Sequence, residues 1–424
     1  ATGNWLAFET KGRAGNQVAI SGVNYSTTAA DNLVQFNGKT AEDLSLCKDT
    51  WYADQNITLY LNDPVKEINK ESKTVHSALG RVVQYDHLIM ATGSAPFVPN
   101  LPGIKKEGVF VYRTIEDLEL IKSYAASAKK GVVMGGGLLG LEAAKALMDL
   151  ELEETSVIEY APRLMPRQID QLASDILQAK LKSLGLSVHL NKGTTSIEGH
   201  GKVEALRFND ATELPADILV ISAGIRPRDE LAKLSGLEVG THGGIVVNQF
   251  MQTSDPSIFA IGECAVFDQL VYGLIAPGYE MAEVAATKIC CGSRTFKGFD
   301  MSTKLKLIGV DVASFGDPFV TGPGARTIVF EDTNKGIYKR INISNDGQFL
   351  LGGILVGDAE AYNMLLQTVT NAIILPPNPE DLLMGARGAG QPQGAGVAGL
   401  PDEALICSCE GPPTYKDVRF PLAR

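Results

Sequence analysis

Residues 131–144 (GVVMGGGLLGLEAA) constrain the fold of this chain more than any other stretch. A short apolar run leads directly into Gly135-x-Gly137-x-x-Gly140, and a helix-forming sequence follows. In such a unit the first glycine permits a tight turn, the second lets backbone N–H groups approach a pyrophosphate, and the third lets the helix pack closely on the strand. We therefore expect a dinucleotide whose phosphates lie at the N-terminus of this helix.

An acidic residue, Glu159, ends the next strand-like run, residues 156–158. It lies about 20 residues after the last glycine, where a carboxylate accepts hydrogen bonds from a ribose 2′-hydroxyl and repels a 2′-phosphate. The sequence therefore predicts NADH rather than NADPH as the ligand. We assign Glu142 and Gly224 to the same NAD site, together with Gly135, Gly137, Gly140 and Glu159.

Apolar runs that end in glycine recur along the chain, and continuous apolar strands of this kind are typical of parallel sheets covered on both faces by helices. The apolar runs are residues 85–92 before Gly93, 131–134 before Gly135, 217–223 before Gly224 and 257–261 before Gly262. The pattern predicts a doubly wound α/β fold with more than one sheet domain. Residues 301–315 and 327–343 alternate like antiparallel strands, and residues 359–374 have a helical apolar period, which predicts a small α+β C-terminal domain.

Composition excludes several classes of protein. The 424 residues are 45% hydrophobic and 21% charged, as in ordinary globular proteins, and the net charge of −11 disfavours nucleic acid as a partner. We expect no membrane span and no secretory signal, and hence a cytoplasmic protein. The five histidines lack metal-ligand spacing, and the six cysteines are too few for a disulfide scaffold. No C-x-x-C or C-x-x-x-x-C occurs, which excludes thioredoxin-reductase and glutathione-reductase chemistry.

Two further motifs flank the glycine-rich turn. A-T-G-S-x-P at residues 91–96 precedes it, and I-G-E at residues 261–263 follows it. In this order the motifs resemble the FAD- and NAD-dependent pyridine nucleotide oxidoreductases, which have two dinucleotide domains. The resemblance implies that Glu263 binds the ribityl chain of FAD. It assigns the FAD site to Ala91, Thr92, Gly93, Gly262, Glu263, Ala276 and Pro277.

A narrower resemblance covers roughly residues 30–411. Residues 40–44, 87–93, 276–282, 302–306, 314–316 and 405–409 look like the reductase portion of the large subunits of NADH-dependent assimilatory nitrite reductases. The resemblance implies that a hydride passes from NADH to FAD, and that electrons continue through a 2Fe-2S cluster to nitrite. Sirohaem and a 4Fe-4S cluster would belong to further domains or to a partner subunit, and no side chain of this chain is needed as a catalytic acid, base or nucleophile.

Other functions remain open from the sequence. The chain could be the electron-transfer subunit of an assimilatory nitrate reductase or a rubredoxin-type NADH reductase, which passes electrons to another acceptor protein. It could also be a flavin-free nucleotide-binding structural subunit. A homodimer is compatible with each of these alternatives.

Two departures from the family pattern stand out. Gly3 and Asn4 are followed by Trp5, where the family's FAD fingerprint requires small turn residues, and Val23 and Asn24 replace the acids expected near the FAD ribose. An indole should block a pyrophosphate, so either FAD binds differently or residues 1–39 are an imperfect record of the chain. We favour the second explanation.

The second departure concerns the 2Fe-2S cluster. Cys407-x-Cys409 resembles the first half of a 2Fe-2S site, but the C-x-x-C needed about thirty residues later is absent from the remaining sequence.

The expected domain organisation follows from these motifs. Residues 1–112 form the first part of the FAD domain, with residues 1–39 atypical, and residues 241–300 form its second part. The NAD domain is 113–240 and the C-terminal α+β domain is 301–384. Residues 385–401, rich in glycine, form a flexible linker, and residues 402–424 begin a truncated 2Fe-2S domain.

Overall fold

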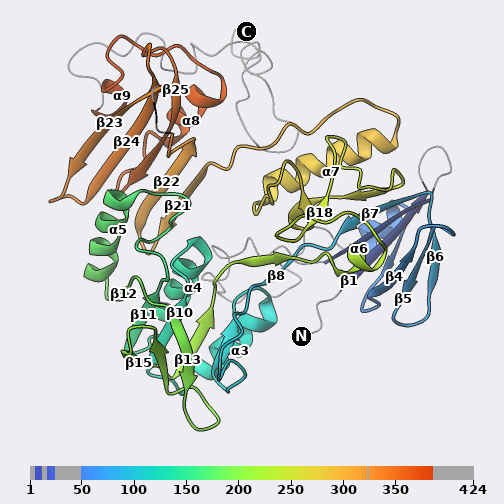
Figure 1. The fold of residues 1–424 in the computed structure, drawn as a ribbon, viewed down its shortest axis with the longest axis horizontal. Helices are drawn as coiled ribbons and strands as arrows, with labels where there is room; N and C mark the ends of the chain where they lie inside the picture. The colour runs from blue at the N-terminus through green and yellow to red at the C-terminus, as the bar shows by residue number, and fades with distance from the viewer. Residues whose placement is uncertain (1–4, 12–16, 24–48, 321, 323, 385–424) are drawn as a thin grey trace. The chain divides into compact units, whose positions relative to one another are not determined.

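The computed structural model describes residues 5–11, 17–23, 49–320, 322 and 324–384. Cys407, Cys409, Asn24 and the expected linker lie outside these residues. The chain divides into two compact units (Figure 1). The first unit comprises Ala1–Phe97, Arg113–Leu118 and Gly224–Phe299, and the second comprises Val98–Tyr112, Glu119–Ala223 and Asp300–Arg424. Of the described helices, none has the length and apolar character that crossing a bilayer requires.

The main sheet of the first unit has five strands in the order β19-β7-β2-β1-β3. Strands β19, β7 and β2 run parallel, whereas β1 is antiparallel to both β2 and β3. Its strands are β1 (Trp5–Lys11), β2 (Gln17–Val23), β3 (Ile57–Tyr60), β7 (His87–Ala91) and β19 (Ile258–Ala260). Because Lys11 is paired with Gln17, β1 and β2 form a hairpin, and this segment is not the strand, glycine turn and helix of an FAD fingerprint.

In the described part of the first unit, three small sheets and four α-helices complete the fold, with α3 continuing into the second unit. The strands are β4 (Val65–Asn69), β5 (Thr74–Ser77) and β6 (Val82–Gln84) in one sheet, β8 (Ser94–Pro96) with β17 (Ile225–Pro227), and β18 (Ile245–Val246) with β20 (Ala265–Val266). The helices are α2 (Asp49–Asp54), α3 (Ile115–Ala125), α6 (Glu230–Leu234) and α7 (Ile275–Ile289), with a 3₁₀ turn η2 (Gly262–Cys264).

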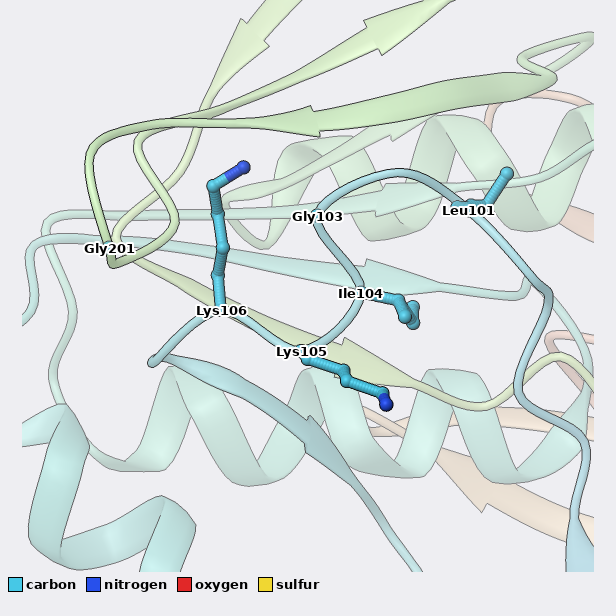
Figure 2. A pocket seen from close by; sticks show the side chains of 6 residues that line it. All are labelled: Leu101, Gly103, Ile104, Lys105, Lys106 and Gly201. Carbon is cyan, nitrogen blue, oxygen red and sulfur yellow. The ribbon is translucent and has the colours of Figure 1, made fainter.

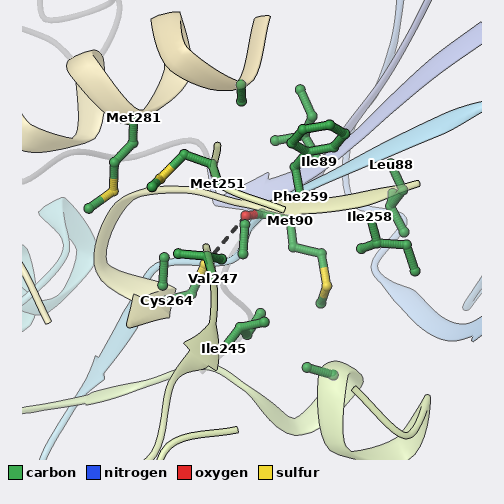
Figure 3. Packing of buried hydrophobic residues seen from close by; sticks show 14 of the residues in the cluster. Leu88, Ile89, Met90, Ile245, Val247, Met251, Ile258, Phe259, Cys264 and Met281 are labelled. Carbon is green, nitrogen blue, oxygen red and sulfur yellow. Dashed lines mark hydrogen bonds between the residues drawn. The ribbon is translucent and has the colours of Figure 1, made fainter. Parts of the chain in front are cut away.

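The core of the first unit lies around β7 and β19, where Leu88, Met90 and Phe259 are buried (Figure 3). The Cys264 thiol donates a hydrogen bond to the Met90 carbonyl oxygen at 3.4 Å, as Figure 3 shows. Burial raises the pKa of the Cys264 thiol, so it stays protonated and acts as a core residue.

The second unit contains a five-stranded parallel sheet in the order β12-β11-β10-β16-β9. Its continuous apolar strands are buried, as the sequence predicts, and helices α4 and α5 connect them. The elements are β9 (Val109–Val111), β10 (Lys130–Met134), α4 (Leu138–Asp149), β11 (Glu154–Ile158), α5 (Gln171–Ser183), β12 (Leu186–His189) and β16 (Ile218–Ile221), with a small antiparallel sheet of β13 (Thr194–Glu198), β14 (Ala205–Phe208) and β15 (Glu213–Pro215).

A second sheet of this unit is antiparallel throughout and has the order β21-β22-β25-β24-β23. Its elements are β21 (Thr303–Leu307), β22 (Val310–Gly316), β23 (Ala325–Asp332), β24 (Ile337–Ser344), β25 (Leu350–Val356), α8 (Tyr362–Thr370) and α9 (Asp381–Met384). Phe315, Ile341, Leu355 and Leu365 share its core. The predicted α/β class with an α+β C-terminal domain is confirmed.

The buried face of this antiparallel sheet gives a direct stability test. Ile341 of β24 is fully buried, whereas Val329 of the neighbouring strand β23 is 46% exposed. We expect Ile341→Ala to lower the free energy of unfolding by about 2–5 kcal/mol, because it leaves a cavity. Val329→Ala should cost less than about 1 kcal/mol. Urea denaturation followed by circular dichroism measures both, and equal losses would contradict the assigned buried face.

Candidate dinucleotide-binding sites

The turn after β10 is built around two glycines that the packing requires. Gly135 has φ of 122°, and a Cβ there would lie 2.2 Å from the Ser222 carbonyl oxygen. A Cβ on Gly140 would lie 1.9 Å from the Gly135 carbonyl oxygen. Neither position can accept a larger residue without moving backbone, so these two glycines hold α4 against the end of β10.

Gly137 differs from both, because a Cβ there would meet no atom of the structure within 4 Å. It is the N-cap of α4, yet it has no side-chain capping hydrogen bond, and the first turn of α4 contains no acidic residue. The first N–H groups of a helix have no partner within the helix and carry partial positive charge. An uncapped helix end beside open space fits a pyrophosphate.

Glu159 lies directly beside this turn. One carboxylate oxygen, Oε2, accepts a hydrogen bond from the Gly136 N–H at 2.6 Å, and Oε1 accepts one from the Ala161 N–H at 2.7 Å. The carboxylate is therefore fixed by backbone while each oxygen keeps a further lone pair for a ligand hydroxyl. The structure thus brings Gly135, Gly137, Gly140 and Glu159 to one edge of the parallel sheet.

Tyr112 is a residue that sequence reasoning missed. It follows β9, whose carboxyl end lies at the same edge of the sheet as Gly135, because β9, β16 and β10 are parallel. Tyr112 is 8% exposed, and its hydroxyl is buried without a hydrogen-bond partner among the described residues. Burial and the charge of Glu142 on α4 raise the pKa of Tyr112, so its hydroxyl stays a donor. Glu142 therefore lies near Tyr112 in the second unit, whereas Gly224 belongs to the first unit.

The two motifs assigned to FAD lie side by side in the first unit. Strands β7 and β19 are parallel neighbours, and the Ile261 N–H donates to the Met90 carbonyl oxygen at 3.0 Å. The loop containing Ala91, Thr92 and Gly93 is thereby placed next to the loop containing Gly262 and Glu263. This adjacency brings together residues that are about 170 positions apart in the sequence, as the Ser94–Glu263 bond shows.

The Glu263 carboxylate is the centre of a polar cluster. Its Oε2 accepts hydrogen bonds from the Ser94 hydroxyl at 2.6 Å and from Arg113 Nη2 at 2.7 Å. Burial and the Arg113 guanidinium lower the pKa of Arg228, whose carbonyl oxygen accepts a hydrogen bond from the Thr92 hydroxyl at 2.6 Å. The Arg113 guanidinium and the Glu263 carboxylate therefore form an ion pair, and Arg228 lies near Arg113.

Sequence reasoning missed Ser94, Arg113 and Arg228 as members of this cluster. A signal for Arg113 was present in Thr114-x-x-Asp117, which is typical of a capping box at a helix start. The Thr114 N–H donates to Asp117 Oδ2 at 2.9 Å, and the Arg113 N–H donates to the same oxygen at 3.2 Å. The box therefore fixes the backbone from which Arg113 reaches Glu263.

Helix α7 contributes Ala276 and Pro277 in its first turn. Its N-cap, Leu274, provides no side-chain hydrogen bond, so the helix end is open to a ligand acceptor. The helix is held against η2 because the Gly262 N–H donates to Met281 Sδ at 3.3 Å. These residues fit the flavin and ribityl half of FAD. The β1–β2 hairpin does not supply the glycine turn and helix expected for its pyrophosphate.

A surface pocket of the second unit lies away from these residues. It is lined by Leu101, Gly103, Ile104, Lys105, Lys106 and Gly201 (Figure 2). Lys106 Nζ donates to the Ile197 carbonyl oxygen at 2.7 Å, whereas the Lys105 side chain points elsewhere (Figure 2). All the lining residues except Gly201 come shortly before β9 in the sequence and so lie near the amino ends of the parallel strands. This pocket is therefore at the edge opposite the glycine turn.

No group of three or more His, Cys, Asp or Glu side chains is arranged to hold a metal ion in the part of the chain that the structure describes. Cys407 and Cys409, the expected cluster ligands, lie outside that part.

The contrast between the glycines predicts opposite outcomes for two small substitutions. Gly137→Ala should fold normally but bind ADP-ribose at least about 10-fold more weakly, because its methyl group occupies the space proposed for the pyrophosphate. Gly140→Ala should destabilise the fold, because its Cβ would clash with backbone. Gly324→Ala is the matched control, since a Cβ there also meets nothing within 4 Å. Calorimetric titration measures the affinity, and wild-type affinity in Gly137→Ala would contradict the assigned phosphate position.

Comparisons with known proteins show the family to which the chain belongs. Residues 7–288 match the pyridine nucleotide-disulphide oxidoreductase family, and residues 302–373 match the C-terminal domain of rubredoxin NAD+ reductase. The chain resembles the putidaredoxin reductase–putidaredoxin complex with a TM-score of 0.71 and 26% identity, over 86% of this chain and 89% of that one.

Curated relatives extend the similarity. The chain is 50% identical over 377 residues to the nitrite reductase (NADH) large subunit of Escherichia coli (strain K12), which covers 88% of this chain and 44% of that protein. It is 36% identical over 389 residues to the assimilatory nitrate reductase electron transfer subunit of Bacillus subtilis (strain 168), covering 91% and 49%. The chain spans about half the length of these relatives or less. The family resemblance expected from the sequence is confirmed, and the chain belongs to the pyridine nucleotide-disulphide oxidoreductase family.

Proposed function

We propose that this chain is the NADH-oxidising flavoprotein portion of an assimilatory nitrite reductase, which reduces nitrite to ammonia. The observation that carries the nucleotide half of this proposal is the open space at Gly137 beside the uncapped N-terminus of α4. No packing constraint from the residues that the structure describes explains a glycine there, whereas a bound pyrophosphate does. Similarity to the Escherichia coli nitrite reductase (NADH) large subunit supports the physiological assignment.

The N-terminus of α4, Glu159 and Glu263 then each have a role in binding. The N–H groups of α4 hold the NADH pyrophosphate, and Glu159 accepts bonds from the adenosine ribose. Glu263, oriented by Ser94 and Arg113, holds the ribityl chain of FAD. FAD, when bound, supplies the exchange between two-electron hydride chemistry and single-electron transfer. The protein's contribution is to position the ligands and to exclude water, so no side chain has to act as acid or base.

The electron exit belongs to the proposal as well. Cys407 and Cys409 provide part of a 2Fe-2S site, and sirohaem and a 4Fe-4S cluster lie in other domains or in a partner subunit. A second candidate is electron transfer to a nitrate reductase or a rubredoxin-like carrier, which the Bacillus subtilis relative and the match of residues 302–373 favour. The hairpin of β1 and β2 favours a third, a flavin-free nucleotide-binding subunit. A cytoplasmic location fits each of them.

An absorbance spectrum separates these functions. We expect the purified chain to show flavin bands that bleach when NADH is added anaerobically, and to reduce an artificial dye with NADH. The double substitution Cys407→Ser and Cys409→Ser should leave dye reduction intact, because the dye takes electrons before the cluster. In the complete enzyme the same change should abolish nitrite reduction. A flavin-free wild-type protein would support the structural alternative, and full nitrite turnover by the double variant would favour a separate carrier.

Nucleotide preference provides the second test. Glu159→Ala removes a carboxylate that we assign to the ribose, so kcat/KM with NADH should fall roughly 10-fold, a loss of about 1.4 kcal/mol. The kcat/KM with NADPH should fall less or rise, because the repulsion between the Glu159 carboxylate and the 2′-phosphate is also lost. Steady-state rates with both nucleotides give the ratio. Glu153→Ala is a suitable control, since Glu153 is an exposed partner of Lys129. An unchanged NADH to NADPH ratio in Glu159→Ala would refute the assignment.

A further inference from the structure

The loop that joins Glu159 to α5, residues 160–170, is tied at its near end to the glycine turn. The Met165 N–H donates to the Gly136 carbonyl oxygen at 2.9 Å. Leu164 packs on Gly136 so closely that a Cβ there would lie 2.7 Å from Leu164 Cδ2. Leu164 and Met165 are almost completely buried. The position of this loop therefore determines the wall behind Glu159.

At its far end the loop is tied to the C-terminal sheet through Asp170. Asp170 caps α5, because its Oδ1 accepts a hydrogen bond from the Ala173 N–H at 3.0 Å. The other oxygen, Oδ2, accepts from the Tyr338 hydroxyl at 2.6 Å and from Arg340 Nη1 at 2.9 Å. Tyr338 and Arg340 both belong to β24. We call Asp170, Tyr338 and Arg340 the Asp170 clamp.

The clamp is shielded from water. Tyr338 is 1% exposed, and the Arg340 and Asp170 side chains are 15% and 17% exposed. Burial and the Asp170 carboxylate raise the pKa of Tyr338, so its hydroxyl remains a donor. Arg340 Nε also donates to Asn342 Oδ1 at 3.1 Å, which fixes the guanidinium on β24. Charge-assisted bonds in such surroundings are stronger than neutral or exposed ones.

The residue that anchors the loop to the glycine turn has an unfavourable backbone conformation. Met165 has φ of 45°, in the left-handed region that costs a non-glycine residue about 1–2 kcal/mol. Such a conformation persists only where the surroundings impose it. The Leu164 N–H donates to the Ser174 hydroxyl at 2.9 Å, so the loop moves with α5. The clamp holds Asp170 at the start of α5 and is therefore well placed to impose the left-handed conformation of Met165.

We propose that the Asp170 clamp positions the loop that walls the adenosine side of the NADH site, so that the C-terminal domain sets the affinity for NADH. This inference rests on the proposed nucleotide function and deepens it. Without the clamp, the backbone of the loop can relax at Met165. Leu164 can then withdraw from Gly136, and this withdrawal loosens the site beside Glu159. Asp170, Tyr338 and Arg340 are positioning residues, because they act through the loop.

The test measures binding of ADP-ribose, which contains the adenosine and pyrophosphate of NADH but no nicotinamide. Asp170→Asn keeps a good helix cap and removes the charge. We expect its Kd for ADP-ribose, by calorimetry on the full chain, to rise about 3- to 10-fold, the range for residues that act through packed neighbours. The limiting rate of NADH oxidation at saturating NADH should not change. Arg340→Met should raise the Kd for ADP-ribose to the same extent. The double variant should bind ADP-ribose no more weakly than either single variant.

A matched ion pair on the same strand distinguishes positioning from general stability. Lys339 Nζ lies 2.6 Å from Asp358 Oδ2, and both residues belong to the C-terminal domain. Asp358→Asn should lower the thermal midpoint without changing the Kd for ADP-ribose. A Kd in Asp170→Asn within twofold of wild type, or an equal rise in Asp358→Asn, would overturn the proposal. If wild-type protein binds no ADP-ribose, the proposed nucleotide function itself fails, and this inference fails with it.

Discussion

The contact between Gly140 and the Gly135 carbonyl oxygen is the constraint on which the nucleotide site depends. There is no room for a Cβ at this point, so α4 approaches the end of β10 as closely as backbone allows. That approach brings the uncapped end of α4 to the edge of the sheet where Glu159 also lies. Gly137 then lies beside space that no atom of the described residues fills. One steric requirement of the fold thus produces the space that we propose for a pyrophosphate.

The first unit reaches a comparable result with charge instead of sterics. Glu263 is held by Ser94 and Arg113 before any ligand arrives, and Arg228 adds a second guanidinium nearby. A carboxylate whose orientation is fixed in advance loses little freedom when it binds a hydroxyl. The antiparallel pairing of β1 with β2 is at odds with this arrangement, because the described residues of this segment, 5–11 and 17–23, do not form the strand and following helix of a dinucleotide fingerprint.

The C-terminal domain contributes more than a separate core. Its strand β24 reaches Asp170 at the start of α5 with two hydrogen bonds, one of them an ion pair. The loop bound to the glycine turn is thus connected to a sheet that begins more than 100 residues later in the sequence. The unfavourable backbone conformation of Met165 is offset by the contacts of its loop with the glycine turn and with strand β24. The domain that carries no nucleotide motif is in this way connected to the loop beside the glycine turn.

The sequence by itself determined the parallel sheet, the α+β end of the chain and the glycine turn with Glu159, because apolar runs and glycine spacing reflect local geometry. It did not reveal the β1–β2 hairpin, since strand direction depends on which neighbours pair. The bonds of Glu263 to Arg113 and of Asp170 to Arg340 join residues 150 and 170 positions apart. Such contacts leave no local pattern, so only the tertiary structure decided that these side chains meet. The buried hydroxyl of Tyr112 became visible for the same reason, because burial depends on what the whole unit packs around it.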